Sequence, residues 1–283
     1  MKIRDLDIDF AQAKIFWAPE DPEFSQFWNG ASTFLPYLEP FLNKTVREGA
    51  NRLPADQSTL REDCRIFIAQ EGRHYRNHAK FNALLRESGY PQLAAREAGM
   101  KADYEGFWKK GLKYSLGYAE GFETLGPIIA CFFLEGAREL QKPSVDDPTA
   151  DLWRWHFAEE YEHRHVCNYL FHQTFPGAYW YRLYGICYAG RHMLSYMIST
   201  ALVLLEQDYK AGRIKKPWHS RLRTFGMLGR LFLFFIPRLL KCLGPRYDPI
   251  HLPTPKRCME VLAEAEAKWA RAKPSAPIEP VAP

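Results

Sequence analysis

Glutamate and histidine recur at helical spacing in two segments of the chain, QEGRHYRNH and HFAEEYEHRH. In each segment one glutamate and two histidines fall at helical spacing, at positions i, i+3 and i+7 in the first and i, i+4 and i+7 in the second: Glu71, His74 and His78, then His156, Glu160 and His163. Because successive residues of an α-helix lie about 100° apart, each set falls on one helix face.

Within these faces, Glu71 with His74 and Glu160 with His163 form two Glu-x-x-His units. Two such units, together with one glutamate from each of two other helices, make up the ligand set of di-metal carboxylate bundles. Carboxylate oxygens reduce the repulsion between two neighbouring cations, and imidazole suits iron, manganese and zinc. These four residues are therefore the surest ligands for two divalent metal ions, with iron favoured and manganese or zinc as alternatives.

The other two carboxylates must come from other helices. Glu39 is the candidate in the first helical segment, with Glu48 a poorer choice near that segment's end. The apolar stretch YSLGYAEGFETLGPIIACFF contains Glu120 and Glu123, one turn apart. A buried carboxylate needs a partner, and a metal ion is a strong one. We predict Glu39 and Glu120 as ligands and place Glu123 in a second tier.

The register of HFAEEYEHRH leaves an alternative open. Glu159 also lies one turn before His163, and Glu162 forms an overlapping Glu-x-x-His unit with His165. His165 lies about 200° around the helix from His163, so the two histidines cannot face one site. We choose Glu160 with His163, and we expect Glu159 either to bridge the ions or to support a ligand.

Single residues of this kind are weak evidence. A lone Glu-x-x-His unit is usually a solvated face, and His78 or His156 alone is more often a packing or surface histidine. We therefore place these two histidines in the second tier, as extra ligands, hydrogen-bond donors or proton relays. Only the combination on several helices predicts a metal centre, and no residue beyond its ligands is assigned a catalytic role.

The elements that would position these residues are helical. No run of short alternating segments with hairpin turns occurs, so we predict an all-α fold. Residues 1–30 are expected to form an irregular leader, residues 31–272 a helical domain with a C-terminal helical extension, and residues 273–283 a disordered proline-rich tail. The expected helices cover residues 32–48, 56–88, 103–141 with an interruption near Gly126-Pro127, 146–175, 179–212, 221–243 and 256–272.

Composition limits the class of protein. The 47% hydrophobic and 25% charged fractions are ordinary for a globular chain, and the net charge of +5 does not by itself indicate nucleic acid. Six cysteines without a Cys-x-x-Cys pair favour reduced thiols and a cytoplasmic location. No segment has the length and apolar character of a signal peptide or a membrane-spanning helix.

Residues 210–246 combine many basic residues with leucine, isoleucine and phenylalanine. Three interpretations stay open, in order of preference. The segment could be a core helix with a basic solvated edge, it could lie on the inner membrane face, or it could grip nucleic acid. The protein is thus expected in the cytoplasm, with peripheral membrane contact as the alternative and nucleic acid as the least favoured partner.

At these motifs the chain resembles the bacterial family labelled predicted metal-dependent hydrolase. The matching stretches are STFLPYLEPFL, FIAQEGRHYRNHAKFN, AEGFE, WHFAEEYEHRHV and GPRYDPIHLP. The resemblance covers roughly residues 30–270 and implies a ferritin-like four-helix bundle core with a di-metal site and additional C-terminal helices. Two positions depart from the family pattern, namely Leu38 before Glu39 and the pair Gly121-Phe122 after Glu120.

Four carboxylates with two histidines favour a di-iron oxidoreductase that activates O₂ to oxidise a small apolar or amphipathic substrate. Since the sequence has no reductant-binding motif, an electron-donor protein or the substrate would supply the electrons. The alternatives are a hydrolase that uses a two-metal-activated water, which is the label of the resembling family, and a binding protein at a membrane surface. Fold alone does not decide between them.

Overall fold

The computed structural model describes residues 1–270, and these are helical with no β-strand among them. The prediction of an all-α fold is confirmed, whereas the ferritin-like arrangement stays a prediction. The predicted proline-rich tail lies outside the described residues. Within residues 1–270, no helix is both long and apolar enough to cross a lipid bilayer.

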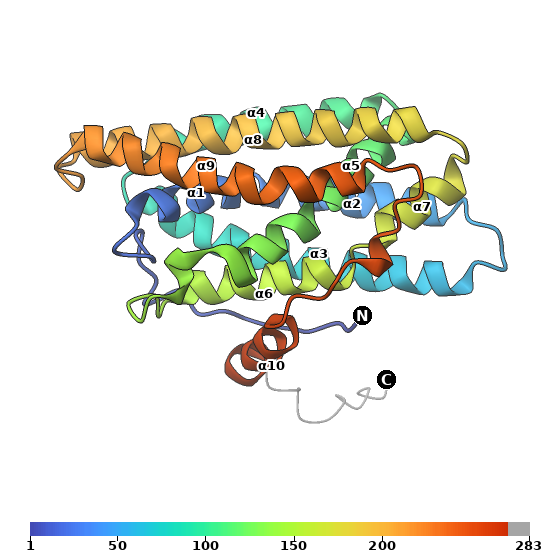
Figure 1. The fold of residues 1–283 in the computed structure, drawn as a ribbon, viewed down its shortest axis with the longest axis horizontal. Coiled ribbons are helices and arrows are strands. Elements are labelled where there is room, and N and C mark those ends of the chain that lie inside the picture. Colours follow the sequence, from blue (N-terminus) through green and yellow to red (C-terminus); the bar gives the residue numbers. More distant parts are fainter. Residues whose placement is uncertain (271–283) are drawn as a thin grey trace, which may run out of the picture.

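Figure 1 shows long helices running side by side along the longest axis of the molecule, with α10 set apart beneath α6. The α-helices are α1 (Pro22–Ser32), α2 (Leu35–Ala50), α3 (Ser58–Glu87), α4 (Leu93–Lys109), α5 (Leu112–Cys131), α6 (Pro148–Glu162), α7 (Val166–Thr174), α8 (Tyr179–Lys210), α9 (Pro217–Cys242) and α10 (Cys258–Trp269). Short π- and 3₁₀-helical segments follow α5, at Phe132–Gly136 and Arg138–Gln141, and a 3₁₀ turn spans Pro249–His251.

The helices differ from those expected chiefly in three places, and α4 and α9 also begin earlier than expected, at Leu93 and Pro217. Helix α1 begins at Pro22, inside the segment expected to be irregular, because this proline occupies the first turn, where no N–H is needed. The expected helix over residues 103–141 is divided at Gly111, whose φ of 89° few other residues adopt, and not at Gly126-Pro127. The expected helix over residues 146–175 is divided at residues 163–165 into α6 and α7.

Helix α5 is the centre of the bundle. Sixteen of its twenty residues are buried, as expected for a helix that is apolar on all sides. It packs against α2, α6, α7 and α8, and α3 packs against α2. The two glutamates of α5 are therefore enclosed by helices, so each needs a partner inside the protein.

Helices α5 and α8 cross at glycines. A Cβ atom on Gly185 would lie 2.1 Å from the carbonyl oxygen of Gly117, and one on Gly121 would lie 2.4 Å from the carbonyl of Gly185. Only hydrogen at these positions allows the two backbones to touch. The close crossing fixes α8 against the helix that carries Glu120 and Glu123.

The two ends of the described chain meet. Leu6 pairs with Ala270 in a single antiparallel bridge, and the Asp7 N–H donates to the carbonyl oxygen of Trp269 at 3.0 Å. Lys2 forms an ion pair with Glu266 of α10 at 2.6 Å. The N-terminal segment, residues 2–7, is thus held against the bundle by α10.

We expect Gly185→Ala to destabilise the protein by about 1–3 kcal/mol or more, because the new methyl group cannot fit between two backbones. The matched control is Gly106→Ala in α4, where no atom lies within 4 Å of an added Cβ, so helix propensity should make it neutral or up to about 1 kcal/mol stabilising. Urea unfolding of both variants measures the difference. Equal effects would contradict the proposed close crossing.

Candidate metal centre

Four helices direct buried carboxylates and imidazoles to one place in the bundle. Two neighbouring clusters form, and within each the potential ligand atoms all lie within 4.8 Å of one another. The first cluster is Glu39, His74 and His156, and the second is Glu71, Glu123, Glu160 and His163. All seven side chains are at most 2% exposed. Helix α2 supplies Glu39, α3 supplies Glu71 and His74, α5 supplies Glu123, and α6 with its C-terminal cap supplies the rest.

The second cluster surrounds the Nε2 atom of His163. This nitrogen lies 3.3 Å from Glu71 Oε1, 3.4 Å from Glu123 Oε2 and 3.4 Å from Glu160 Oε2. Three carboxylate oxygens and one imidazole nitrogen thus converge from three helices. This is the donor set of a divalent metal site with mixed oxygen and nitrogen ligands.

Glu71 and Glu160 face both clusters. Glu160 places Oε1 3.2 Å from His156 Nε2 and Oε2 3.4 Å from His163 Nε2. Glu71 Oε1 lies 3.3 Å from His163 Nε2 and 3.6 Å from His74 Nδ1. If two cations were bound, Glu71 and Glu160 would be placed to contribute oxygens to both.

The unsatisfied polar atoms test whether metal ions fit. Both oxygens of Glu39, Glu71 and Glu123 are buried without a hydrogen-bond partner, and so are Glu160 Oε2, His74 Nδ1 and His163 Nε2. Buried polar groups are normally paired, and an isolated buried charge is costly. Four carboxylates balance the charge of two divalent cations. The residues therefore fit a pair of divalent ions, while the donor set accepts iron, manganese or zinc.

Without bound cations, the pKa values of these side chains also show that the clusters need positive charge. Burial, followed by the negative charge of Glu71, raises the pKa of Glu39 well above its usual value. Burial and the charge of Glu160 raise the pKa of Glu123 to about 8. Burial alone would lower the pKa of His163, but Glu160 and Glu123 outweigh it and raise that pKa. Protons would thus replace cations in this cluster, because the carboxylates repel one another.

Each histidine has its second nitrogen held by a hydrogen bond. His74 Nε2 lies 3.1 Å from Glu159 Oε2, and Glu159 Oε1 accepts from Arg4 at 3.0 Å. Arg4 also donates to both oxygens of Glu162. The carboxylate of Glu159 therefore holds the proton of His74 on Nε2 and leaves Nδ1 free for a cation, an arrangement that orients many metal-bound histidines.

A glutamine does the same for His163. His163 Nδ1 lies 3.2 Å from Gln70 Oε1, and Gln70 Nε2 donates to Glu162 Oε2 at 2.9 Å and to the carbonyl oxygen of Lys2 at 3.0 Å. Because the amide of Gln70 must donate to these two acceptors, its oxygen faces the imidazole. In the neutral imidazole of His163 the proton is thus on Nδ1, and Nε2 is free for a cation within the cluster.

A chain of four side chains, which runs from Asn82 through Ser32 and His78 to His156, orients the imidazole at its end. Asn82 Nδ2 donates to the carbonyl oxygen of Ser32 at 2.8 Å, so Asn82 Oδ1 accepts from the Ser32 hydroxyl at 2.6 Å. Ser32 Oγ then accepts from His78 Nδ1 at 2.8 Å, and His78 Nε2 accepts from His156 Nδ1 at 3.1 Å. The Nε2 atom of His156 is left unprotonated, 3.2 Å from Glu160.

Glu120 lies outside both clusters and is not placed as a ligand. Its Oε1 accepts from Arg182 Nε at 2.7 Å, Asn168 Nδ2 at 2.8 Å and Thr124 Oγ1 at 2.9 Å. A buried arginine of α8 thus neutralises this carboxylate. Glu123, which we placed in the second tier, takes the position that we predicted for Glu120.

The structure brings together the other predicted ligands, Glu39, Glu71, His74, Glu160 and His163. Of the second-tier residues, His156 lies in a cluster, whereas His78 and Glu159 lie in the surrounding layer of hydrogen bonds. Glu48, the poorer alternative, forms an exposed ion pair with Arg52. The sequence analysis missed the groups that hold the ligands or neutralise Glu120, namely Arg4, Ser32, Gln70, Asn82 and Arg182. Only Gln70 carried a local signal, since it directly precedes Glu71.

A family model described as predicted metal-dependent hydrolase matches residues 2–252, which include every residue of both clusters. The chain belongs to this family. Neither the curated proteins nor the solved structures contain a significant match to the chain. Membership of the predicted metal-dependent hydrolase family therefore rests on the family model.

The family assignment corrects the functional prediction. The expected di-iron oxidoreductase is contradicted, and the alternative, a metal-dependent hydrolase, is supported. The ligand count on which the expectation rested is also different. His156 joins His74 and His163, so the two clusters contain three imidazoles with four carboxylates.

We expect the purified protein to bind two divalent ions per chain. Glu71→Gln should lose both ions, because Glu71 faces both clusters. Glu120→Gln should keep both ions but lose about 3–5 kcal/mol of stability, because it leaves Arg182 buried without its charge partner. Elemental analysis and urea unfolding measure the two effects, with the exposed Glu87→Gln on α3 as control. Loss of metal in Glu120→Gln while Glu71→Gln retains it would contradict this assignment.

Ser32→Ala should weaken metal binding by about 10–100-fold, because it removes the acceptor that sets the tautomers of His78 and His156. Ser220→Ala is the matched control, since it removes a buried hydroxyl in α9 that has no hydrogen-bond partner. Competition with a chelating dye gives both affinities. Equal affinities in the two variants would show that the chain of four side chains does not orient a ligand.

Proposed function

We propose that this chain is a hydrolase that uses a pair of divalent ions held by Glu39, Glu71, His74, Glu123, His156, Glu160 and His163. One observation carries the proposal. Glu71 and Glu160 face two adjacent clusters, and seven oxygens of the four clustered carboxylates are buried without a hydrogen-bond partner. Membership of a predicted metal-dependent hydrolase family supports the same reaction class.

When bound, a pair of divalent ions supplies Lewis acidity that polarises a carbonyl or phosphoryl oxygen and makes water a better nucleophile at neutral pH. The chain's own contribution is to place the donor atoms. Glu71 and Glu160 hold the two positions close together. Glu159, Gln70 and His78 keep the imidazoles in the tautomers that leave one nitrogen free.

Burial is the second contribution of the chain. Aromatic rings pack against the imidazoles, with Trp155 centred 4.8 Å from His74 and Phe67 centred 4.7 Å from His163. These rings keep water from the histidines on their outer sides. Charge interactions in such a place are stronger than in water, so polarisation of a substrate would be effective there.

We expect hydrolysis of an activated ester or phosphodiester, measured with p-nitrophenyl acyl esters and bis(p-nitrophenyl) phosphate. Activity should disappear on treatment with a chelator and return with added zinc, manganese or iron. Glu71→Gln should lose at least about 100-fold in kcat/KM, because it removes a carboxylate that faces both clusters. Glu87→Gln, an exposed change on the same helix, should keep the full rate. Hydrolysis that survives complete removal of metal would refute the proposal.

A further inference from the structure

Helix α9 presents an apolar stripe to solvent. Its members are spaced three or four residues apart along the helix, and Gly229 takes the place of one apolar residue between Phe225 and Leu233. The members are Trp218, Leu222, Phe225, Leu233, Ile236 and Leu240. All are exposed, with Leu233 at 77% and Phe225 at 69%. An apolar face of this length on the outside of a protein marks an interaction surface.

The charges around the stripe identify the kind of surface that it fits. Residues 210–246 contain ten lysine and arginine residues and no aspartate or glutamate. Four of these cations pair with carboxylates of other segments. Six form no ion pair within the described part of the chain: Lys215, Lys216, Arg221, Arg238, Lys241 and Arg246. Unpaired cations beside an apolar face complement an anionic lipid surface.

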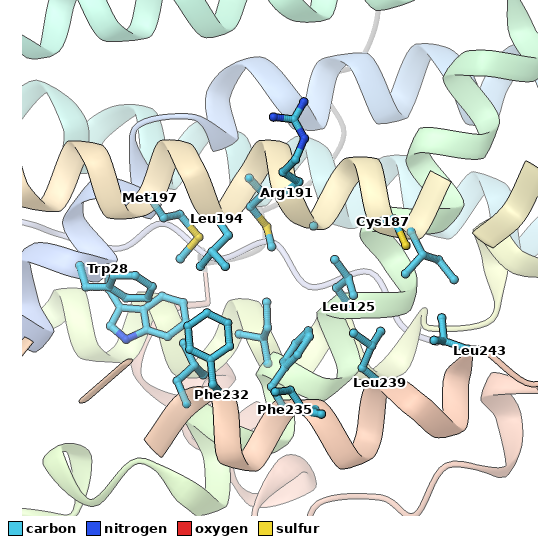
Figure 2. A pocket seen from close by; sticks show the side chains of 17 residues that line it. Trp28, Leu125, Cys187, Arg191, Leu194, Met197, Phe232, Phe235, Leu239 and Leu243 are labelled. Atoms are coloured by element: carbon cyan, nitrogen blue, oxygen red, sulfur yellow. The ribbon is translucent and has the colours of Figure 1, made fainter. Parts of the chain in front are cut away.

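A cavity lies beneath this helix. It has a volume of about 290 Å³, and α8 and α9 form its two walls while α1 and α5 form its floor. Figure 2 shows Leu194 and Met197 of α8 facing Phe232 and Phe235 of α9 across it. Arg191 is the one charged residue of the lining, and its guanidinium points away from the α9 wall. The lining thus offers a ligand mainly apolar contacts, as an acyl chain requires.

The stripe and the cavity share residues. Ile236 belongs to the stripe and also lines the cavity, and its neighbour Phe232 lines the cavity while 37% exposed. One wall of the cavity is therefore the helix that faces solvent. An acyl chain could pass from a surface that contacts α9 into the cavity without crossing a polar region.

We propose that α9 lies on an anionic lipid bilayer and that the cavity between α8 and α9 binds one acyl chain taken from it. A second copy of this chain is a poorer occupant, because packing through the same face would bring two cationic segments without acidic residues together. The hydrolase function proposed above is a separate claim. Bilayer docking and acyl binding do not depend on it.

Vesicle co-sedimentation of the full chain tests the docking. We expect binding to vesicles of phosphatidylcholine that contain about 30% phosphatidylglycerol. Partitioning to pure phosphatidylcholine, or to the anionic vesicles at high salt, should be at least about 10-fold weaker. Phe225→Glu with Leu233→Glu should abolish binding. Met259→Glu, an equally exposed apolar position on α10, should not. Equal partitioning of both variants, or a dimer that Phe225→Glu with Leu233→Glu dissociates, would overturn the proposal.

A fluorescent fatty acid tests the cavity in the absence of vesicles. Leu194→Trp and the milder Leu194→Phe fill the space from α8, so both should weaken probe binding, the larger side chain by at least about 10-fold, while vesicle partitioning stays unchanged. Unfolding curves confirm that the variants are folded. Unchanged probe affinity in both would overturn acyl binding. Because neither assay needs catalysis, failure here is distinct from failure of the proposed hydrolase reaction.

Discussion

Mutual repulsion among buried carboxylates is the constraint on which the rest of this structure depends. Glu39, Glu71, Glu123 and Glu160 are brought together inside the bundle, and most of their oxygens lack a proton donor. Such a group is stable only when positive charge lies among its members. Two divalent ions would supply the same positive charge as four protons, and they would also bind the free imidazole nitrogens. The centre of the bundle is therefore organised for ions.

The surrounding hydrogen bonds show how the bundle orients these ligands. Each clustered histidine uses one nitrogen outside the cluster, with Glu159, Gln70 or His78 as its partner. Those partners are themselves fixed by other groups, among them Arg4 and the carbonyl oxygen of Lys2. The outer groups come from segments that are far apart in the chain. The ligands are thus held by the assembled bundle and not by their own helices alone.

Helical spacing in the sequence was enough to predict Glu71 with His74 and Glu160 with His163, because a turn of helix fixes which residues share a face. It favoured Glu120 over Glu123, whereas the structure places Glu123 in a cluster and Glu120 outside both. These residues lie only about 60° apart on α5, and the choice depends on Arg182, a residue of another helix. The division of the predicted helix at Gly111 was missed, because its positive φ is a choice that the local sequence permits but does not require. The reaction class was predicted wrongly, because a count of ligands carries little information about chemistry.

The contact between the two ends of the described chain has a consequence for the order of folding. Arg4 holds Glu159, but the N-terminal segment is itself held by α10 through Glu266 and Trp269. During synthesis the contacts of these first residues with α3 and α6 can form early, whereas their contacts with α10 must wait until nearly the whole described chain has been made. The inner ligands on α2, α3, α5 and α6 can assemble earlier than this support. A nascent chain would thus gather its ligands before α10 exists, and the docking of α10 would add the last contact to Arg4, through Glu266.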